Sequence, residues 1–138
     1  NGIIAALLTP IINKLTIKLD SGYNLIIGYI LYSAGILAVI FLNSYIFLVI
    51  LMIIYTIGEI LITINSSVFE ARYTPKTHRG RFSSVKSVTF NLASFVGVYV
   101  MSYLFEYYTY NIGLLIIGLM PIISLIIVTL IIKYSKAE

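Results

Sequence analysis

The dominant pattern along the chain is the length of its apolar runs. Stretches of about 20 residues rich in Ile, Leu, Val and Tyr alternate with short polar segments. About 20 helical residues span roughly 30 Å, the thickness of the hydrocarbon core of a bilayer. The pattern therefore predicts an all-α integral membrane bundle with no soluble domain. We expect a truncated helix at residues 2–17 and four full spans at 23–42, 45–72, 84–105 and 111–132.

Polar residues inside these predicted helices recur at helical spacing. Steps of three and four residues keep side chains on one face of a helix. Such a one-sided polar stripe faces other helices or water rather than lipid. One stripe lies in the span 45–72 and contains Thr56, Glu59, Thr63, Ser66 and Glu70. A second lies in the span 84–105 and contains Ser84, Ser87, Asn91 and Ser94.

Small residues in two of the spans predict faces where helices pack closely. Gly28 and Gly35 are two turns apart, and Ala93 and Gly97 are one turn apart. Small side chains at such spacing let the backbones of membrane helices approach each other. We therefore expect helix packing at both pairs rather than contacts with a ligand.

The composition and charge agree with a membrane protein. Hydrophobic residues make up 60% of the chain and charged residues 10%, against about a quarter charged in a soluble domain. Connections with Lys or Arg alternate with connections that have neither, so all 9 Lys and Arg residues fall on one side of the membrane. Such an excess of basic residues marks the cytoplasmic side. We therefore expect a multi-pass protein of the plasma membrane with a cytoplasmic C-terminus. The net charge of +4 reflects this topology and not a nucleic-acid partner.

Glu59 is the strongest candidate for chemistry. A charge near the middle of a membrane costs several kcal/mol unless it is paired or protonated. Two alternatives stay open: a proton or cation site in a transport pathway, or a structural acid that hydrogen-bonds a neighbouring helix. On the first alternative, Thr56, Thr63 and Asn91 are further candidates for transport or coupling. The sequence contains no catalytic triad, no metal-spaced cluster and no Cys, so we predict no enzyme activity, cofactor or metal.

The segment 73–83 is predicted to be a basic loop. Pro75 ends the preceding helix, and Gly80 between Arg79 and Arg81 permits a tight turn. The arginines form either a latch that binds a helix end or a carboxylate, or a signal that only orients the chain.

These motifs together carry a family resemblance. A Gly58-Glu59 pair in a membrane helix, followed by Pro75 and the Arg79-Gly80-Arg81 sequence, resembles the C-terminal half of the major facilitator superfamily. The resemblance covers helices eight (partial) to twelve of a twelve-helix permease. It implies a C-terminal fragment, a missing N-terminal helical bundle as partner, and transport of a small molecule with a proton gradient. The version with Arg-Gly-Arg is similar to drug-efflux antiporters.

The residues alone also allow a second class of protein. A small multi-span scaffold that binds partner helices in the bilayer, and transports nothing, would have the same hydropathy pattern.

Overall fold

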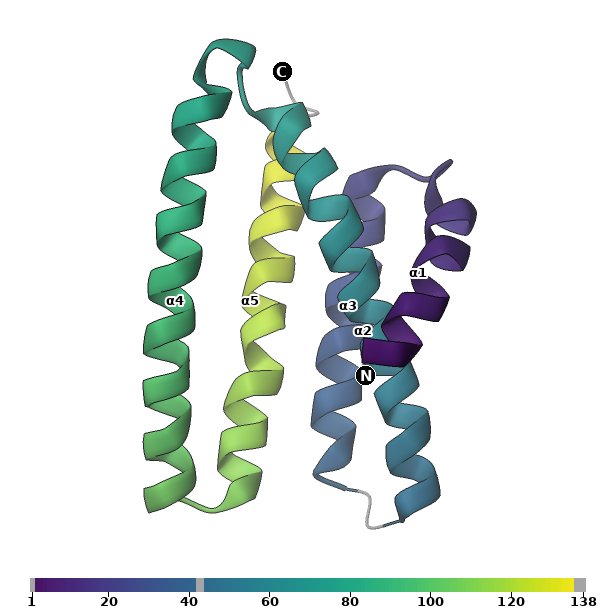
Figure 1. Cartoon of the computed structure of the whole chain (residues 1–138), viewed down its shortest axis with the longest axis vertical. Helices are drawn as coiled ribbons and strands as arrows, with labels where there is room; N and C mark the ends of the chain where they lie inside the picture. Colours follow the sequence, from purple (N-terminus) through teal and green to yellow (C-terminus); the bar gives the residue numbers. More distant parts are fainter. Residues whose placement is uncertain (1, 42–43, 136–138) are drawn as a thin grey trace.

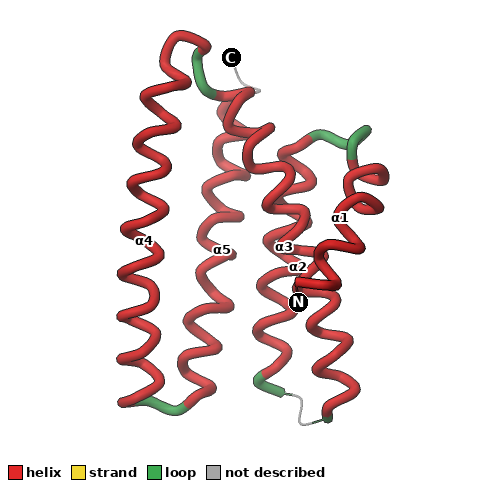
Figure 2. Tube along the Cα trace, viewed as in Figure 1, coloured by secondary structure: helices red, strands yellow, loops and turns green. Residues whose placement is uncertain are grey.

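The computed structural model describes residues 2–41 and 44–135, and these residues form helices and short connections without a strand. The expected all-α membrane bundle is therefore confirmed. Four helices, α2 to α5, are long and apolar enough to cross a membrane. The elements in chain order are α1 (Gly2–Thr16), α2 (Ser21–Val39), α3 (Tyr45–Tyr73), η1 (Lys76–His78), α4 (Arg79–Tyr107) and α5 (Tyr110–Ser135) (Figures 1 and 2).

Helix α2 lies at the centre of the packing. It contacts both α3 and α5, whereas α1 rests against α3. Helix α4 stands at the edge of the bundle beside α5, and none of its residues is buried (Figure 1). Most exposed side chains of the bundle are large and apolar, as expected for a surface in contact with lipid tails or other membrane helices.

Two small apolar clusters lie between the helices. One joins α1 to α3 through Ile12, Ile60 and Leu61. The other joins α2, α3 and α5 and consists of Leu25, Phe69 and Val128. These clusters fix α2, α3 and α5 relative to one another, and so they place the residues between them.

The α3–α4 connection differs from the sequence prediction. Helix α3 ends at Tyr73, two residues before Pro75, because a residue that precedes proline is disfavoured in the helical region. The turn η1 then completes the reversal, and α4 begins at Arg79 instead of residue 84. The prediction of a loop through Gly80 and Arg81 was therefore wrong: both lie in the first turn of α4. Gly80 does not make a tight turn, because no glycine in the described residues has a positive φ.

The other helix ends lie within a few residues of their expected positions. Helix α2 begins at Ser21, two residues early, because Asp20 caps it by accepting a hydrogen bond from the Gly22 backbone N–H at 2.8 Å. The expected end of this helix at residue 42 lies outside the described residues. Helix α5 extends to Ser135, slightly beyond the predicted boundary.

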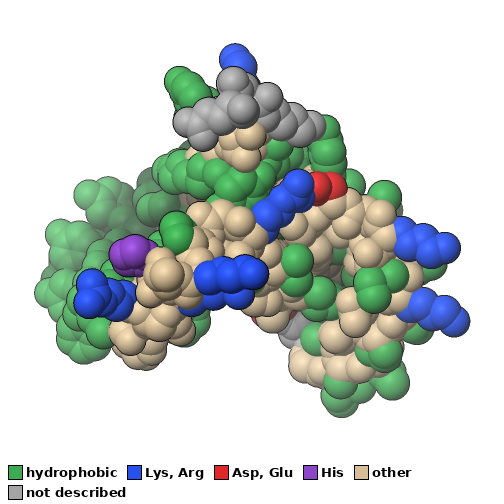
Figure 3. All heavy atoms as spheres, turned by 90° about the horizontal axis from the view of Figure 1, so that it is seen from above, with side chains coloured by type: hydrophobic (Ala, Val, Ile, Leu, Met, Phe, Trp, Pro, Cys, Tyr) green, Lys and Arg blue, Asp and Glu red, His purple; other side chains and the backbone are tan. Residues whose placement is uncertain are grey.

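The basic residues gather at one end of the bundle. This end carries the α1–α2 connection, η1 and the end of α5, at the top of Figure 1. Seen from above, the Lys and Arg side chains spread across it (Figure 3). We call it the basic end; the α4–α5 connection lies at the opposite end.

Candidate functional site

Glu59 lies at the midpoint of α3, one of the four described helices that are apolar enough to cross a membrane. Helix α3 has as many residues before Glu59 as after it. The side chain is partly buried and lines a pocket of about 460 Å³ between three helices. Such a volume is within the range of pockets that bind small molecules.

The pocket is lined by apolar residues and a few polar ones. Helix α2 contributes two tyrosines, α3 contributes the acid and a threonine, and α5 contributes a serine beside a proline. The lining residues are Tyr29, Tyr32, Glu59, Ile62, Thr63, Met120, Pro121, Ile123 and Ser124. One carboxyl group among four hydroxyls gives a site that can exchange a proton and bind a hydrogen-bonding or cationic molecule.

Two contacts hold α2 in place beside the pocket. The hydroxyls of Tyr32 and Tyr55 are 3.4 Å apart, and their rings pack with centroids at 4.6 Å. On α5, the carbonyl oxygen of Gly118 accepts a hydrogen bond from the Ser33 hydroxyl at 2.5 Å. Pro121, one turn further along, lacks an N–H and interrupts the helical hydrogen-bond ladder where α5 borders the pocket.

The other predicted transport residues are only partly brought to this site. Thr63 lines the pocket, and its hydroxyl donates to the backbone oxygen of Glu59 at 2.8 Å. Thr56 is fully buried and donates to the Met52 carbonyl, so it faces the helix interface rather than the pocket. Asn91 is exposed on α4 and is absent from the lining residues; its amide donates to its own helix at 2.9 Å.

Of the two pairs of small residues predicted to pack against a helix, one lies at a close contact between the described helices. Gly28 and Gly35 both lie at the α2–α3 contact, where a Cβ added to either would be within 3.2 Å of α3 atoms. Ala93 and Gly97 are not at a tight contact between the described helices. A Cβ added to Gly97 would have no neighbour within 4 Å, because α4 is uncovered on most of its surface.

The basic end is held together by three polar contacts between helix ends. Arg79 donates to the carbonyl oxygen of Ala71 at 2.8 Å, in the last turn of α3, where a cation interacts favourably with the helix dipole. Lys86 pairs with Glu70 at 2.6 Å and so joins α4 to α3. These two contacts hold the first turns of α4 against α3.

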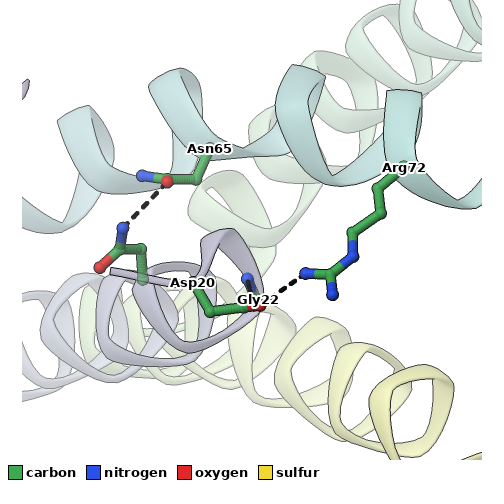
Figure 4. Close-up of polar contacts among 5 residues, drawn as sticks. Asp20, Gly22, Asn65 and Arg72 are labelled. Carbon is green, nitrogen blue, oxygen red and sulfur yellow. Dashed lines mark hydrogen bonds and ion pairs between the residues drawn. The ribbon is translucent and has the colours of Figure 1, made fainter. Parts of the chain in front are cut away.

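The third contact ties α3 to the start of α2. Arg72 pairs with Asp20 at 2.5 Å, and Asp20 also caps α2 (Figure 4). Deeper in the bundle, the amide of Asn24 donates to the Asn65 side chain at 3.1 Å and to the carbonyl of Thr16 at the end of α1. Three helices therefore meet at this asparagine pair.

Sequence reasoning missed several of these residues. Asn24 and Asn65 are amides inside apolar spans, and an amide at such a position is itself a signal for contact between helices. Tyr29, Tyr32 and Ser124 could not be assigned to the pocket, because their relation to Glu59 depends on how three helices pack.

The long apolar helices, the buried polar contacts between them and the acid at mid-span define a multi-span membrane protein of the helical-bundle class. The comparison with family models gives a match to the Major Facilitator Superfamily over residues 1–138. The chain therefore belongs to the Major Facilitator Superfamily, and its function is that of a transporter of this type, as the resemblance indicated. Comparisons with curated proteins and with solved structures gave no match.

Proposed function

We propose that this chain is part of a proton-coupled permease in which Glu59 binds and releases a proton as a small molecule crosses the membrane. The observation that carries the proposal is the pocket that Glu59 lines, because α2, α3 and α5 each contribute residues with a hydroxyl group to the same lining. A permanent bare charge at mid-membrane is costly, so a carboxyl group that alternates between charged and neutral forms suits this position. Hydroxyls can donate to the carboxylate and accept from the neutral acid.

The chemistry of the pocket favours a substrate with a cationic or hydrogen-bonding group on an apolar body. The carboxylate attracts a cation, and the rings of Tyr29 and Tyr32 offer faces that also favour one. The apolar side chains of Ile62, Met120 and Ile123 would cover the remaining surface of such a molecule. These properties suit amphipathic drugs, and efflux is the direction that the resemblance of the sequence implies.

We further propose that α4 faces the N-terminal helical bundle of the same protein. Its polar stripe, from Ser84 to Ser94, is exposed although it lies in a helix of membrane-spanning length. Polar side chains at this depth need helices or water beside them. We place the basic end, the C-terminus included, on the cytoplasmic side of the plasma membrane, because Lys and Arg accumulate on that side.

Labelling with dicyclohexylcarbodiimide tests the protonation of Glu59 without a known substrate. This apolar reagent modifies protonated carboxyl groups in membranes, and mass spectrometry locates the adduct. We expect an adduct at Glu59 in the whole protein that decreases as the pH is raised. Glu70, which is paired with Lys86 at the basic end, is the internal control and should stay unlabelled. Labelling of Glu70 alone would contradict the proposal.

A transport assay tests the coupling itself. Inverted membrane vesicles that contain the whole protein should accumulate ethidium when a proton gradient is imposed. Glu59→Gln keeps the shape and the hydrogen bonding of the side chain but cannot ionise. We expect this variant to insert normally and to lose gradient-driven accumulation. Unchanged accumulation in Glu59→Gln would leave Glu59 with a structural role only.

A further inference from the structure

The two arginines at the start of α4 have different surroundings. Arg79 donates to the end of α3. Arg81 instead lines a separate pocket of about 530 Å³ between the end of α3, η1 and the first turns of α4. The other lining residues are Tyr73, Thr74, Pro75, His78, Phe82 and Val85.

This second pocket opens on the apolar side of α4. Val85, Leu92, Val96 and Tyr103 recur at steps of four and seven residues, and all four are exposed. At 100° per residue this strip lies about 140° around the helix from the polar stripe of Ser84 to Ser94. If the polar stripe faces protein or water, the apolar strip faces lipid. Arg81 lies one turn before Val85 and therefore at the end of this strip.

The charges around the pocket favour the binding of an anion. Neither ion pair between the described side chains involves Arg81. His78 lines the same pocket, and the basic end places further positive charge nearby (Figure 3). Tyr73, Phe82 and Val85 add apolar surface to the lining. The pocket thus combines a cationic group with apolar side chains, and Val85 joins it to the apolar strip of α4.

We propose that this pocket binds an anionic phospholipid, with the headgroup phosphate on Arg81 and an acyl chain along the strip that starts at Val85. A guanidinium group binds a phosphate with two parallel hydrogen bonds, and basic pockets at the ends of membrane helices suit such headgroups. Glu59 plays no part in this site, so the inference is independent of the proposed coupling and rests only on the proposed orientation of α4.

Native mass spectrometry of the whole purified protein tests the site. Phosphatidylglycerol is titrated, and the dissociation constant of each bound lipid is measured. We expect Arg81→Gln to weaken the tightest binding about tenfold, as expected for the loss of a charge-assisted hydrogen bond. The matched control is Lys76→Gln, which removes the same charge from the neighbouring turn η1 but does not line the pocket. It should weaken binding less than twofold. Equal weakening by both variants would show diffuse attraction and overturn the proposal.

Two further probes distinguish a lipid from other occupants. Phosphatidylcholine of the same chain length lacks net negative charge, and glycerol phosphate lacks acyl chains; both should bind at least about tenfold more weakly. Phosphatidylglycerol with a photoreactive group in its acyl chain should crosslink to residues 82–96. Phosphatidylcholine binding as tight as that of phosphatidylglycerol would overturn the proposal. Crosslinks confined to the remaining helices would overturn it too, since protein would then cover this pocket.

Discussion

The close contact between α2 and α3 makes Gly58→Ala the most informative single substitution in the bundle. Gly58 precedes Glu59 and lies against α2, where Gly28 faces it. A Cβ added at Gly58 would lie 2.6 Å from the backbone nitrogen of Tyr32 and 2.8 Å from the backbone oxygen of Gly28. Both atoms belong to a helix backbone, so no side-chain rotation can relieve the contact.

The change in the free energy of unfolding caused by Gly58→Ala follows from two opposing contributions. Restoring an ordinary contact of 3.4 Å requires a separation of roughly 0.8 Å between α2 and α3. Overpacking of this kind costs about 1–3 kcal/mol, and contact with backbone places the cost at the upper end. Alanine is a better helix former than glycine by about 1 kcal/mol. We therefore expect Gly58→Ala to destabilise the protein by about 2 kcal/mol.

Thermal unfolding of the whole protein in detergent measures this effect. The matched control is Gly97→Ala, where the added Cβ has no neighbour within 4 Å and only the gain in helix propensity remains. We expect a lower melting temperature for Gly58→Ala and an equal or higher one for Gly97→Ala. Gly58→Ala should also reduce transport, because the displaced backbone carries Glu59. A wild-type melting temperature for Gly58→Ala would refute the close approach of α2 and α3.

Three further changes test the topology, a contact at the basic end and the asparagine pair deeper in the bundle. The chain lacks Cys, so single cysteines can be introduced as labels. Thr77→Cys should be inaccessible to an impermeant maleimide outside intact cells, whereas Ser44→Cys should react. Labelling of Thr77→Cys alone would show the opposite orientation. Arg79→Lys keeps the positive charge but loses the guanidinium group that donates to the last turn of α3. Transport should fall while membrane insertion stays normal. Full transport would limit the role of Arg79 to orienting the chain. Asn65→Leu leaves the buried amide of Asn24 without its side-chain partner and should destabilise the bundle by about 1–3 kcal/mol, measured by thermal unfolding. An unchanged melting temperature would show that this hydrogen bond does not contribute to stability.

The sequence by itself determined the class of the fold and the residue at the centre of the candidate site. Apolar runs of bilayer length can satisfy their backbone groups only as helices, so hydropathy is enough to predict the spans. Glu59 stood out in the same way, because a carboxyl group among Ile and Leu is recognisable without knowledge of the neighbouring helices. The family motif at Gly58, Arg79 and Gly80 was equally visible in the linear order of residues.

Only the tertiary structure decided which residues meet. Tyr32 and Ser124 line the same pocket as Glu59 because α2 packs against both α3 and α5, and no local pattern encodes that approach. The same holds for α4, whose early start at Arg79 depends on contacts with the end of α3. Helix periodicity fixes the direction of each side chain around its own axis, whereas the partner on that side is set by packing between elements that are distant in the sequence. Arg79 and Arg81, two residues apart, therefore lie in separate surroundings that their shared motif did not distinguish.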